Sequence, residues 1–128
     1  MTTLPTVFIT GASSGIGATY AERFARRGHD LVLVARDDSR LDKLAGRLRA
    51  ECHVAIEVLP ADLTRPADLA ALETRLREDA RICILINNAG MAQAGSFLDQ
   101  SAEAIERLIT LNTTAPTRLA AAIAPRFA

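Results

Sequence analysis

The stretch Thr10-Gly11-Ala12-Ser13-Ser14-Gly15-Ile16-Gly17 follows directly on an apolar run and leads into a helical pattern. It predicts a glycine-rich turn between a β-strand and an α-helix. Gly11 allows the tight reversal, Gly15 lets the backbone approach a pyrophosphate, and Gly17 lets the helix pack close to the sheet. A pyrophosphate would be held there by free N–H groups and the helix dipole. A tight turn without a ligand is the alternative interpretation.

Four short apolar runs cover residues 6–10, 30–35, 54–59 and 82–87. The second and fourth are continuous rather than alternating, as expected of strands that helices cover on both faces. Helical stripes lie between and after them: Ile16, Tyr20 and Phe24; Leu41, Leu44 and Leu48; Leu69, Leu72 and Leu76; and a longer stretch from Ser101 to Phe127. This order predicts an α/β fold, a Rossmann-type doubly wound parallel sheet of four βα units in strand order 3-2-1-4. Residues 1–128 are expected to form one domain.

Residues typical of helix ends mark the boundaries of the predicted helices. Gly28 is expected to close the first helix. Thr64 is a candidate N-cap for the third helix, with Pro66 in its first turn. Pro116 predicts a kink or a break within the last helical stretch.

The composition excludes several classes of protein. Lys plus Arg and Asp plus Glu are 15 each, so no global charge attracts nucleic acid or an anionic membrane. The apolar runs are far shorter than the roughly 20 residues that span a bilayer. His29 and His53 have no partner at metal-ligand spacing and are expected at the surface, so no metal site is predicted. No secretory signal is visible, and Cys52 and Cys83 are expected to be reduced thiols in the cytoplasm.

Three further motifs accompany the Gly-x-x-x-Gly-x-Gly turn. Asp62-Leu63 follows the third run, Asn87-Asn88-Ala89-Gly90 ends the fourth, and Leu111-Asn112 lies in the following helix. With these motifs in this order, the chain resembles the short-chain dehydrogenase/reductase family over almost its whole length. A flavin or S-adenosylmethionine protein of the same fold is a further alternative, against which the Asn-Asn-Ala-Gly segment and Asn112 argue together.

The resemblance implies a set of site residues. The cofactor-binding residues are expected to be Gly11, Ser13, Ser14, Gly15, Ile16, Gly17, Arg36, Asp62, Leu63, Asn88, Ala89 and Gly90. Asn112 is expected to be catalytic, by helping to hold a water in the proton relay. Each assignment has an alternative: Asp62 could start a turn or cap a helix, and Asn87 and Asn88 could satisfy backbone groups at the strand end. Asn112 alone would suggest only a helix irregularity.

The residues after the second run predict NADP as the cofactor rather than NAD. An NAD-binding chain of this fold places an acid at the end of this strand. Here Ala35 occupies that position and Arg36 follows, and a guanidinium can bind a 2′-phosphate through paired charge-assisted hydrogen bonds. Asp37 and Asp38 are the counter-evidence, since a slip of one or two residues would place an acid at the ribose.

The resemblance implies hydride transfer between NADPH and a small-molecule carbonyl or secondary alcohol, with the substrate left unspecified. It also implies a catalytic serine and a Tyr-x-x-x-Lys pair beyond the helix that carries Asn112. Tyr20 is the only tyrosine and Lys43 the only lysine, and they do not form that motif. The 128 residues are therefore expected to be an incomplete, inactive N-terminal half of the enzyme. A non-catalytic nucleotide-binding or interaction module is the alternative.

An incomplete sheet has consequences for packing. The strand at 82–86 would present an apolar edge, and Leu119, Ile123 and Phe127 would be only partly covered. A weakly stable fold, or one completed by a partner surface, is expected. The resemblance implies a homo-oligomer, a dimer or tetramer, for the full-length protein.

Overall fold

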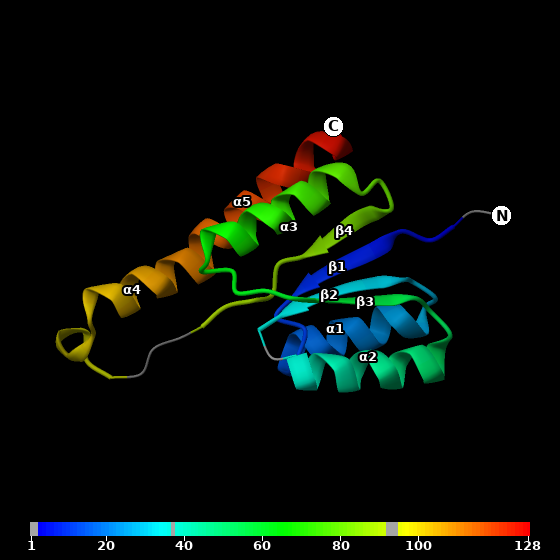
Figure 1. Ribbon diagram of the computed structural model, residues 1–128, viewed down its shortest axis with the longest axis horizontal. Helices are drawn as coiled ribbons and strands as arrows, with labels where there is room; N and C mark the ends of the chain where they lie inside the picture. Colours follow the sequence, from blue (N-terminus) through cyan, green and yellow to red (C-terminus); the bar gives the residue numbers. More distant parts are fainter. Residues whose placement is uncertain (1–2, 37, 92–94) are drawn as a thin grey trace.

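A computed structural model describes residues 3–36, 38–91 and 95–128 of the chain. Within these ranges, four parallel strands form one sheet in the order β3-β2-β1-β4 (Figure 1). The strands are β1 (Thr6–Thr10), β2 (Leu31–Ala35), β3 (Ile56–Pro60) and β4 (Ile82–Ile86). The predicted fold class and strand order are confirmed.

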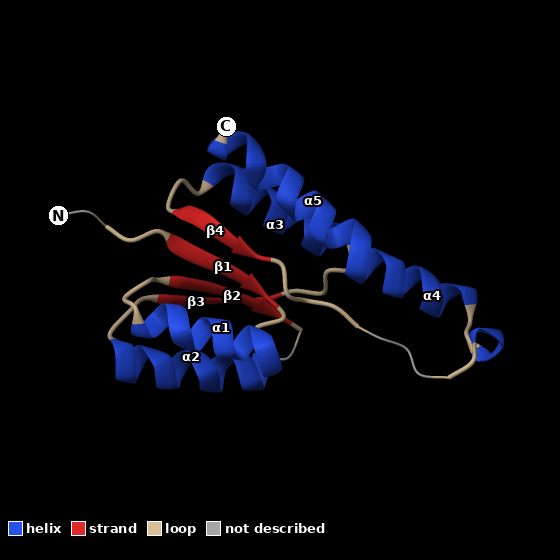
Figure 2. Cartoon of the chain, turned by 180° about the vertical axis from the view of Figure 1, so that it is seen from behind, coloured by secondary structure: helices blue, strands red, loops and turns tan. Residues whose placement is uncertain are grey.

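Helices cover both faces of this sheet. They are α1 (Gly15–Arg26), α2 (Asp38–Cys52), α3 (Pro66–Glu78), α4 (Ala102–Ile109) and α5 (Ala115–Ile123), with short 3-10 segments at Phe97–Asp99 and Ala124–Phe127. Helices α1 and α2 lie on one face, α3 and α5 lie on the other, and α4 extends beyond the end of the sheet (Figure 2). Gly28, with φ +93°, follows the end of α1 as predicted.

The two faces of the sheet carry two separate apolar cores. On β2, Leu31 and Leu33 belong to the core beneath α1 and α2, whereas Val32 and Val34 belong to the core beneath α3 and α5. All four side chains are almost fully buried. Because alternate residues of a strand point to opposite faces, a strand covered on both sides must be apolar throughout, which explains the unbroken run in the sequence.

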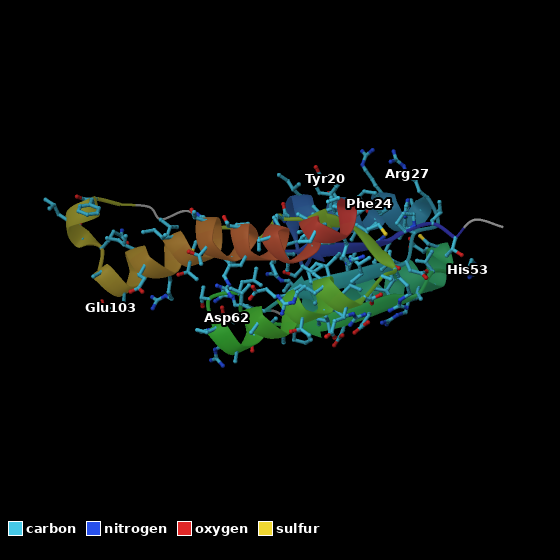
Figure 3. All side chains as sticks on the ribbon, turned by 90° about the horizontal axis from the view of Figure 1, so that it is seen from above. Tyr20, Phe24, Arg27, His53, Asp62 and Glu103 are labelled. Atoms are coloured by element: carbon cyan, nitrogen blue, oxygen red, sulfur yellow. The ribbon has the colours of Figure 1, made fainter. Side chains whose placement is uncertain are left out.

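Only part of the apolar stripe on α1 faces the core: Phe24 packs against it, whereas the other two residues of the stripe do not. Ile16 is 70% exposed and Tyr20 is 42% exposed. The buried residues are Gly17, Ala21 and Ala25, whose small side chains let α1 lie close to the sheet. Figure 3 places Tyr20 on the outer surface of the molecule.

Only one of the two histidines lies at the surface as predicted. His53 is exposed, but His29 is half-buried. Its ring packs edge-on against Phe24 at a centroid distance of 5.3 Å, and its Nδ1 lies 2.7 Å from the carbonyl oxygen of Pro5. These contacts give His29 a structural part in joining the first helix to the chain before β1.

Thr64 does not cap α3, so that prediction is wrong. Arg65 occupies the N-cap position without a side-chain capping bond, and Pro66 begins the helix. Thr64 instead donates its backbone N–H and its hydroxyl to Oδ1 of Asp62, at 2.9 and 2.6 Å. Asp62 therefore forms the turn that the alternative interpretation described, with its other carboxylate oxygen left for further contacts.

The last helical stretch is interrupted by a π-helical turn at Thr110–Thr114, not broken at Pro116. The backbone N–H of Ala115 donates to the carbonyl oxygen of Thr110, which is the five-residue spacing of a π-turn. Pro116 lies in the first turn of α5, where its missing N–H costs little.

Helix α5 is better covered than the sequence suggested. Leu119 is 0% and Ile123 is 3% exposed, which corrects the expectation for both, whereas Phe127 is 54% exposed. The covering surface is α3, to which α5 is also joined by a salt bridge between Arg118 and the buried Glu73 at 3.1 Å. The apolar edge expected at β4 is only partly exposed, since residues 84–86 are half-buried.

Candidate cofactor-binding site

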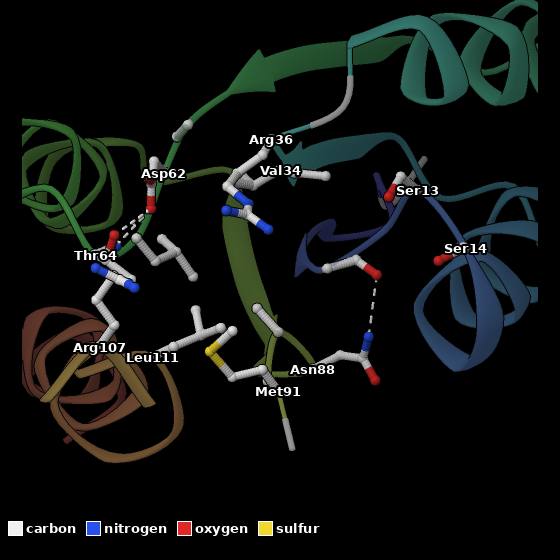
Figure 4. Close-up of a pocket in the computed structure, with 16 residues that line it drawn as sticks. Ser13, Ser14, Val34, Arg36, Asp62, Thr64, Asn88, Met91, Arg107 and Leu111 are labelled. Atoms are coloured by element: carbon white, nitrogen blue, oxygen red, sulfur yellow. Dashed lines mark hydrogen bonds between the residues drawn. The ribbon is translucent and has the colours of Figure 1, made fainter. Parts of the chain in front are cut away.

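A cavity of about 440 Å³ lies beyond the carboxyl ends of the strands. It lies where the strand order reverses, because β2 pairs with one side of β1 and β4 pairs with the other. In open parallel sheets, this reversal point is where ligands bind. Nine of the predicted residues line the cavity: Gly11, Ser13, Ser14, Arg36, Asp62, Leu63, Asn88, Ala89 and Gly90 (Figure 4).

Gly15, Ile16, Gly17 and Asn112 are not part of the cavity wall. Gly15 has φ +58°, a left-handed conformation that glycine adopts without strain. A Cβ on Gly17 would collide with the carbonyl oxygen of Gly11 and lie 2.6 Å from Nδ2 of Asn88. These two glycines therefore shape the turn and seat the start of α1 against it, while Ile16 projects outward.

The N-terminus of α1 is suited to bind an anion. Its N-cap residue, Ser14, makes no side-chain capping hydrogen bond, and the first turn contains no acidic residue. The N–H groups at the start of a helix carry partial positive charge and need acceptors from outside the helix. A phosphate group would supply such acceptors.

Thr10 fixes the loop that follows β4. Its hydroxyl oxygen accepts hydrogen bonds from the backbone N–H groups of Asn88 and Ala89, at 3.1 and 3.0 Å. The side chain of Asn88 donates to the carbonyl oxygen of Gly11 at 3.1 Å, and that of Asn87 donates to the carbonyl oxygen of Pro116 at 3.1 Å. The glycine-rich turn and the Asn-Asn-Ala-Gly segment thus form one hydrogen-bonded wall. Sequence reasoning missed this use of Thr10.

Both polar groups of the Asn112 side chain bind the backbone of Met91. Oδ1 accepts from the Met91 N–H at 2.8 Å, and Nδ2 donates to the Met91 carbonyl oxygen at 2.6 Å. A Cβ on Gly90 would lie 3.1 Å from the same Oδ1, so a side chain at position 90 would press against this contact. Asn112, in the π-turn, thereby fixes the end of the segment that lines the cavity.

The opposite end of the cavity combines a carboxylate with a backbone donor. The hydrogen bond from the Thr64 side chain lowers the pKa of Asp62, and the charges of Arg36 and Arg65 lower it further, so the carboxylate is ionised. Its Oδ2 faces Arg65 only at 3.9 Å. Within the described ranges, no acceptor bonds the N–H of the neighbouring Leu63. The Asp62 carboxylate, an ionised hydrogen-bond acceptor, therefore lies next to the Leu63 N–H, a donor that no described residue uses.

Arg36 extends into the cavity from the end of β2 (Figure 4). No residue in the described ranges forms a salt bridge with it. The counter-evidence to NADP as the cofactor rested on Asp37 and Asp38, either of which would place an acid at the ribose. Asp37 lies outside the described residues, and so does the side chain of Asp38.

Seven lining residues were not predicted: Val34, Ala35, Ala61, Thr64, Met91, Arg107 and Leu111. Most adjoin a predicted residue in the sequence. Leu111 adjoins Asn112 in the π-turn, and Arg107 lies four residues earlier in α4, where helical spacing from Leu111 was the only signal for it.

Across the described part of the chain, no helix is long and apolar enough to cross a membrane. The same residues contain no cluster of His, Cys, Asp and Glu that could hold a metal ion. Cys52 and Cys83 are both free thiols; Cys52 is half-buried and Cys83 is exposed.

Residues 5–128 match the family model described as short chain dehydrogenase. Among relatives, the oxidoreductase UcpA of Escherichia coli K12 is 39% identical over 123 residues, which cover 95% of this chain and 46% of that protein. A very-long-chain 3-oxoacyl-CoA reductase of Kluyveromyces lactis is 33% identical over 124 residues, covering 93% of this chain and 35% of the relative. The chain therefore spans less than half the length of these relatives.

Two solved structures are similar at higher identity. A short-chain dehydrogenase from Sphingobium yanoikuyae in complex with NADPH is 82% identical with a TM-score of 0.95, covering 97% of this chain and 48% of that one. A bulky-bulky ketone specific alcohol dehydrogenase from Comamonas testosteroni is 70% identical with a TM-score of 0.97, covering 98% of this chain and 50% of that one.

Proposed function

Since this chain belongs to the short-chain dehydrogenase family, we propose that its cavity binds NADP(H) and that residues 1–128 are the cofactor-binding domain of an oxidoreductase. The observation that carries the proposal is the convergence, in one cavity, of the uncapped helix α1 and the Asp62–Leu63 pair. These features are complementary to the pyrophosphate and to the adenine base of an adenine dinucleotide.

The base would bind beside Asp62 and Leu63. Adenine presents an amino donor next to a ring-nitrogen acceptor on one edge. Oδ2 of the ionised Asp62 matches the donor, and the N–H of Leu63, which no described acceptor bonds, matches the acceptor. The pyrophosphate would then lie at Ser14 and the start of α1, with Gly15 and Gly17 shaping the turn.

Arg36 would bind the 2′-phosphate. Its guanidinium lines the cavity and has no salt-bridge partner in the described ranges, so none of the described acids competes with a phosphate for it. The NADPH complex of the Sphingobium yanoikuyae relative supports this assignment. The nicotinamide end would lie along Asn88, Ala89 and Gly90.

NADPH, when bound, would supply the hydride that reduces a carbonyl group. Asn112 would act through Met91, by holding the loop that lines this end of the cavity. Each polar group of its side chain makes one bond to Met91, and the remaining lone pair of Oδ1 and N–H of Nδ2 could still bind a water in the proton relay. Ile16, exposed at the start of α1, is kept as a proposed cofactor contact on the resemblance alone.

The tyrosine and lysine that the family resemblance implies for proton transfer are not supplied by the only tyrosine and the only lysine of this sequence. Tyr20 lies on the outer surface of α1, Lys43 is exposed on α2, and neither lines the cavity. We therefore propose that residues 1–128 bind cofactor without turnover. The Comamonas testosteroni relative, specific for bulky-bulky ketones, supports ketones with two large substituents as the substrate class of the whole enzyme.

The test compares residues 1–128 with a chimaera in which the remaining half of the Sphingobium yanoikuyae protein follows residue 128. We expect both proteins to bind NADPH, measured by nucleotide fluorescence, and only the chimaera to oxidise it with a bulky ketone. Turnover by residues 1–128, or no NADPH binding by either protein, would contradict the proposal. A chimaera that binds NADPH and reduces no ketone would favour the non-catalytic module.

We also propose that the full-length protein is a homo-oligomer. No residue of α4 is buried, and Ile109 is 53% exposed, so the helix leaves an apolar face available to a second copy. Sedimentation equilibrium of the chimaera should give a dimer or tetramer, and a monomer at all concentrations would contradict this proposal.

A further inference from the structure

The cavity contains a second arginine that none of the family motifs includes. Arg107 lies in the last turn of α4 and lines the cavity together with Leu111, one turn further along. Figure 4 shows its side chain reaching from α4 toward Thr64 and Asp62, on the wall opposite Ser13 and Ser14.

The guanidinium of Arg107 has no hydrogen bond or salt bridge to any residue in the described ranges. Other arginines of the chain are paired: Arg75 with Glu57 and Asp79, and Arg118 with Glu73. Asp62 does not serve as its partner, since its closest cation is Arg65 at 3.9 Å. Arg107 is thus a cation directed at a ligand cavity, and no carboxylate in the described ranges neutralises it.

We propose that Arg107 binds the adenine base of the cofactor, with its planar guanidinium against the purine opposite Leu63. This proposal rests on the proposed function and assigns Arg107 a part different from that of Arg36. Arg36 enters from the end of β2, whereas Arg107 enters beside the Asp62–Leu63 pair that matches the adenine edge. A guanidinium stacks on a flat π-system, which lysine does not do equally well.

The experiment measures dissociation constants of NADPH, NADH and reduced nicotinamide mononucleotide, which has no adenine, by fluorescence titration of the purified protein. Arg107→Ala should weaken NADPH and NADH by the same factor, about three- to thirtyfold, and leave the mononucleotide unchanged. Arg107→Lys should recover little of the loss. Arg23→Ala, at an exposed arginine of α1 outside the cavity, is the matched control and should change nothing.

Three results would overturn the proposal while leaving NADP binding intact. The first is an unchanged affinity of Arg107→Ala for both dinucleotides. The second is a loss of affinity in Arg107→Ala that is confined to NADPH, and the third is full recovery of affinity in Arg107→Lys. The second and third results would indicate that Arg107 contacts a phosphate instead. If the unmodified protein binds neither dinucleotide, both the proposed function and this inference fail together.

Discussion

Arg36 is the residue on which we propose that cofactor selectivity depends, because its guanidinium lines the cavity at the end of β2 and forms no salt bridge with any described residue. Arg36→Ala should weaken NADPH by about ten- to hundredfold, since hydrogen bonds between charged groups contribute about 1.5–3 kcal/mol. NADH has no 2′-phosphate, so its affinity should change by less than about twofold. Titration of both nucleotides checks this, and an equal loss for both would show that Arg36 contacts something other than the 2′-phosphate.

Gly17 allows the start of α1 to approach the glycine-rich turn. Gly17→Ala should lower the free energy of unfolding by about 1–3 kcal/mol and weaken NADPH binding, because the new Cβ would force α1 away from the Gly11 carbonyl. Gly46→Ala is the control, since Gly46 is exposed on α2 and a Cβ there would meet nothing within 4 Å. That variant should gain about 0.4–1 kcal/mol in urea unfolding. Equal effects of the two substitutions would contradict the packing role of Gly17.

Single residues could be predicted where a motif fixes their position along the chain. Gly11, Asp62 and Asn88 were found because each lies within two residues of the end of a strand, and strand ends converge in a parallel sheet. Arg107 could not be found in this way. It reaches the cavity only because α4 projects past the sheet, and that placement depends on packing between distant elements.

At the scale of elements, the π-turn and the loop after β4 act as one unit through Asn112 and Met91. Asn112→Ala should lower the free energy of unfolding by about 1–2 kcal/mol, since two hydrogen bonds are lost at a site that water can reach. NADPH affinity should fall as well, because Met91 lines the cavity. Thr113→Ala, an exposed residue of the same π-turn, is the matched control. Unchanged stability and binding in Asn112→Ala would show that the contact does not hold the loop.

The sequence predicted the existence and order of elements better than the faces they bury. Strands of continuous apolar residues and helices between them leave little choice of fold. On α1, however, close approach to the sheet favoured Gly17 and Ala21 over the larger Ile16 and Tyr20. Leu119 was expected to be partly covered because coverage by α3 cannot be read from the pattern of α5 alone.

At the scale of the whole molecule, an ion-pair network joins β3, the end of α3 and the start of β4. Arg75 binds Glu57 at 2.6 Å and Asp79 at 2.9 Å, and Arg81 also binds Asp79 at 2.9 Å. The hydrogen bond from Arg81, with further bonds from Arg75, holds the pKa of Asp79 far below its usual range. Arg75 similarly lowers the pKa of Glu57.

These lowered pKa values predict acid sensitivity. A carboxylate whose folded pKa is depressed stabilises the fold at pH values above its unfolded pKa, about 3.9 for Asp, and this stabilisation is lost as the pH falls toward the folded pKa. Asp79→Asn should therefore cost about 1–2 kcal/mol at neutral pH, and the difference from the unmodified protein should shrink below about pH 4. Urea unfolding across this range measures the effect, with the exposed Asp99→Asn as control. A constant difference down to about pH 2 would contradict the role given to the network.

The most direct test of the account is a titration of the unmodified protein with NADPH and NADH at the same salt concentration. The cavity geometry predicts that NADPH binds about ten- to hundredfold more tightly, because only NADPH carries the 2′-phosphate that Arg36 would bind. Equal affinity for the two nucleotides would contradict the assignment of Arg36 and, with it, NADP as the cofactor.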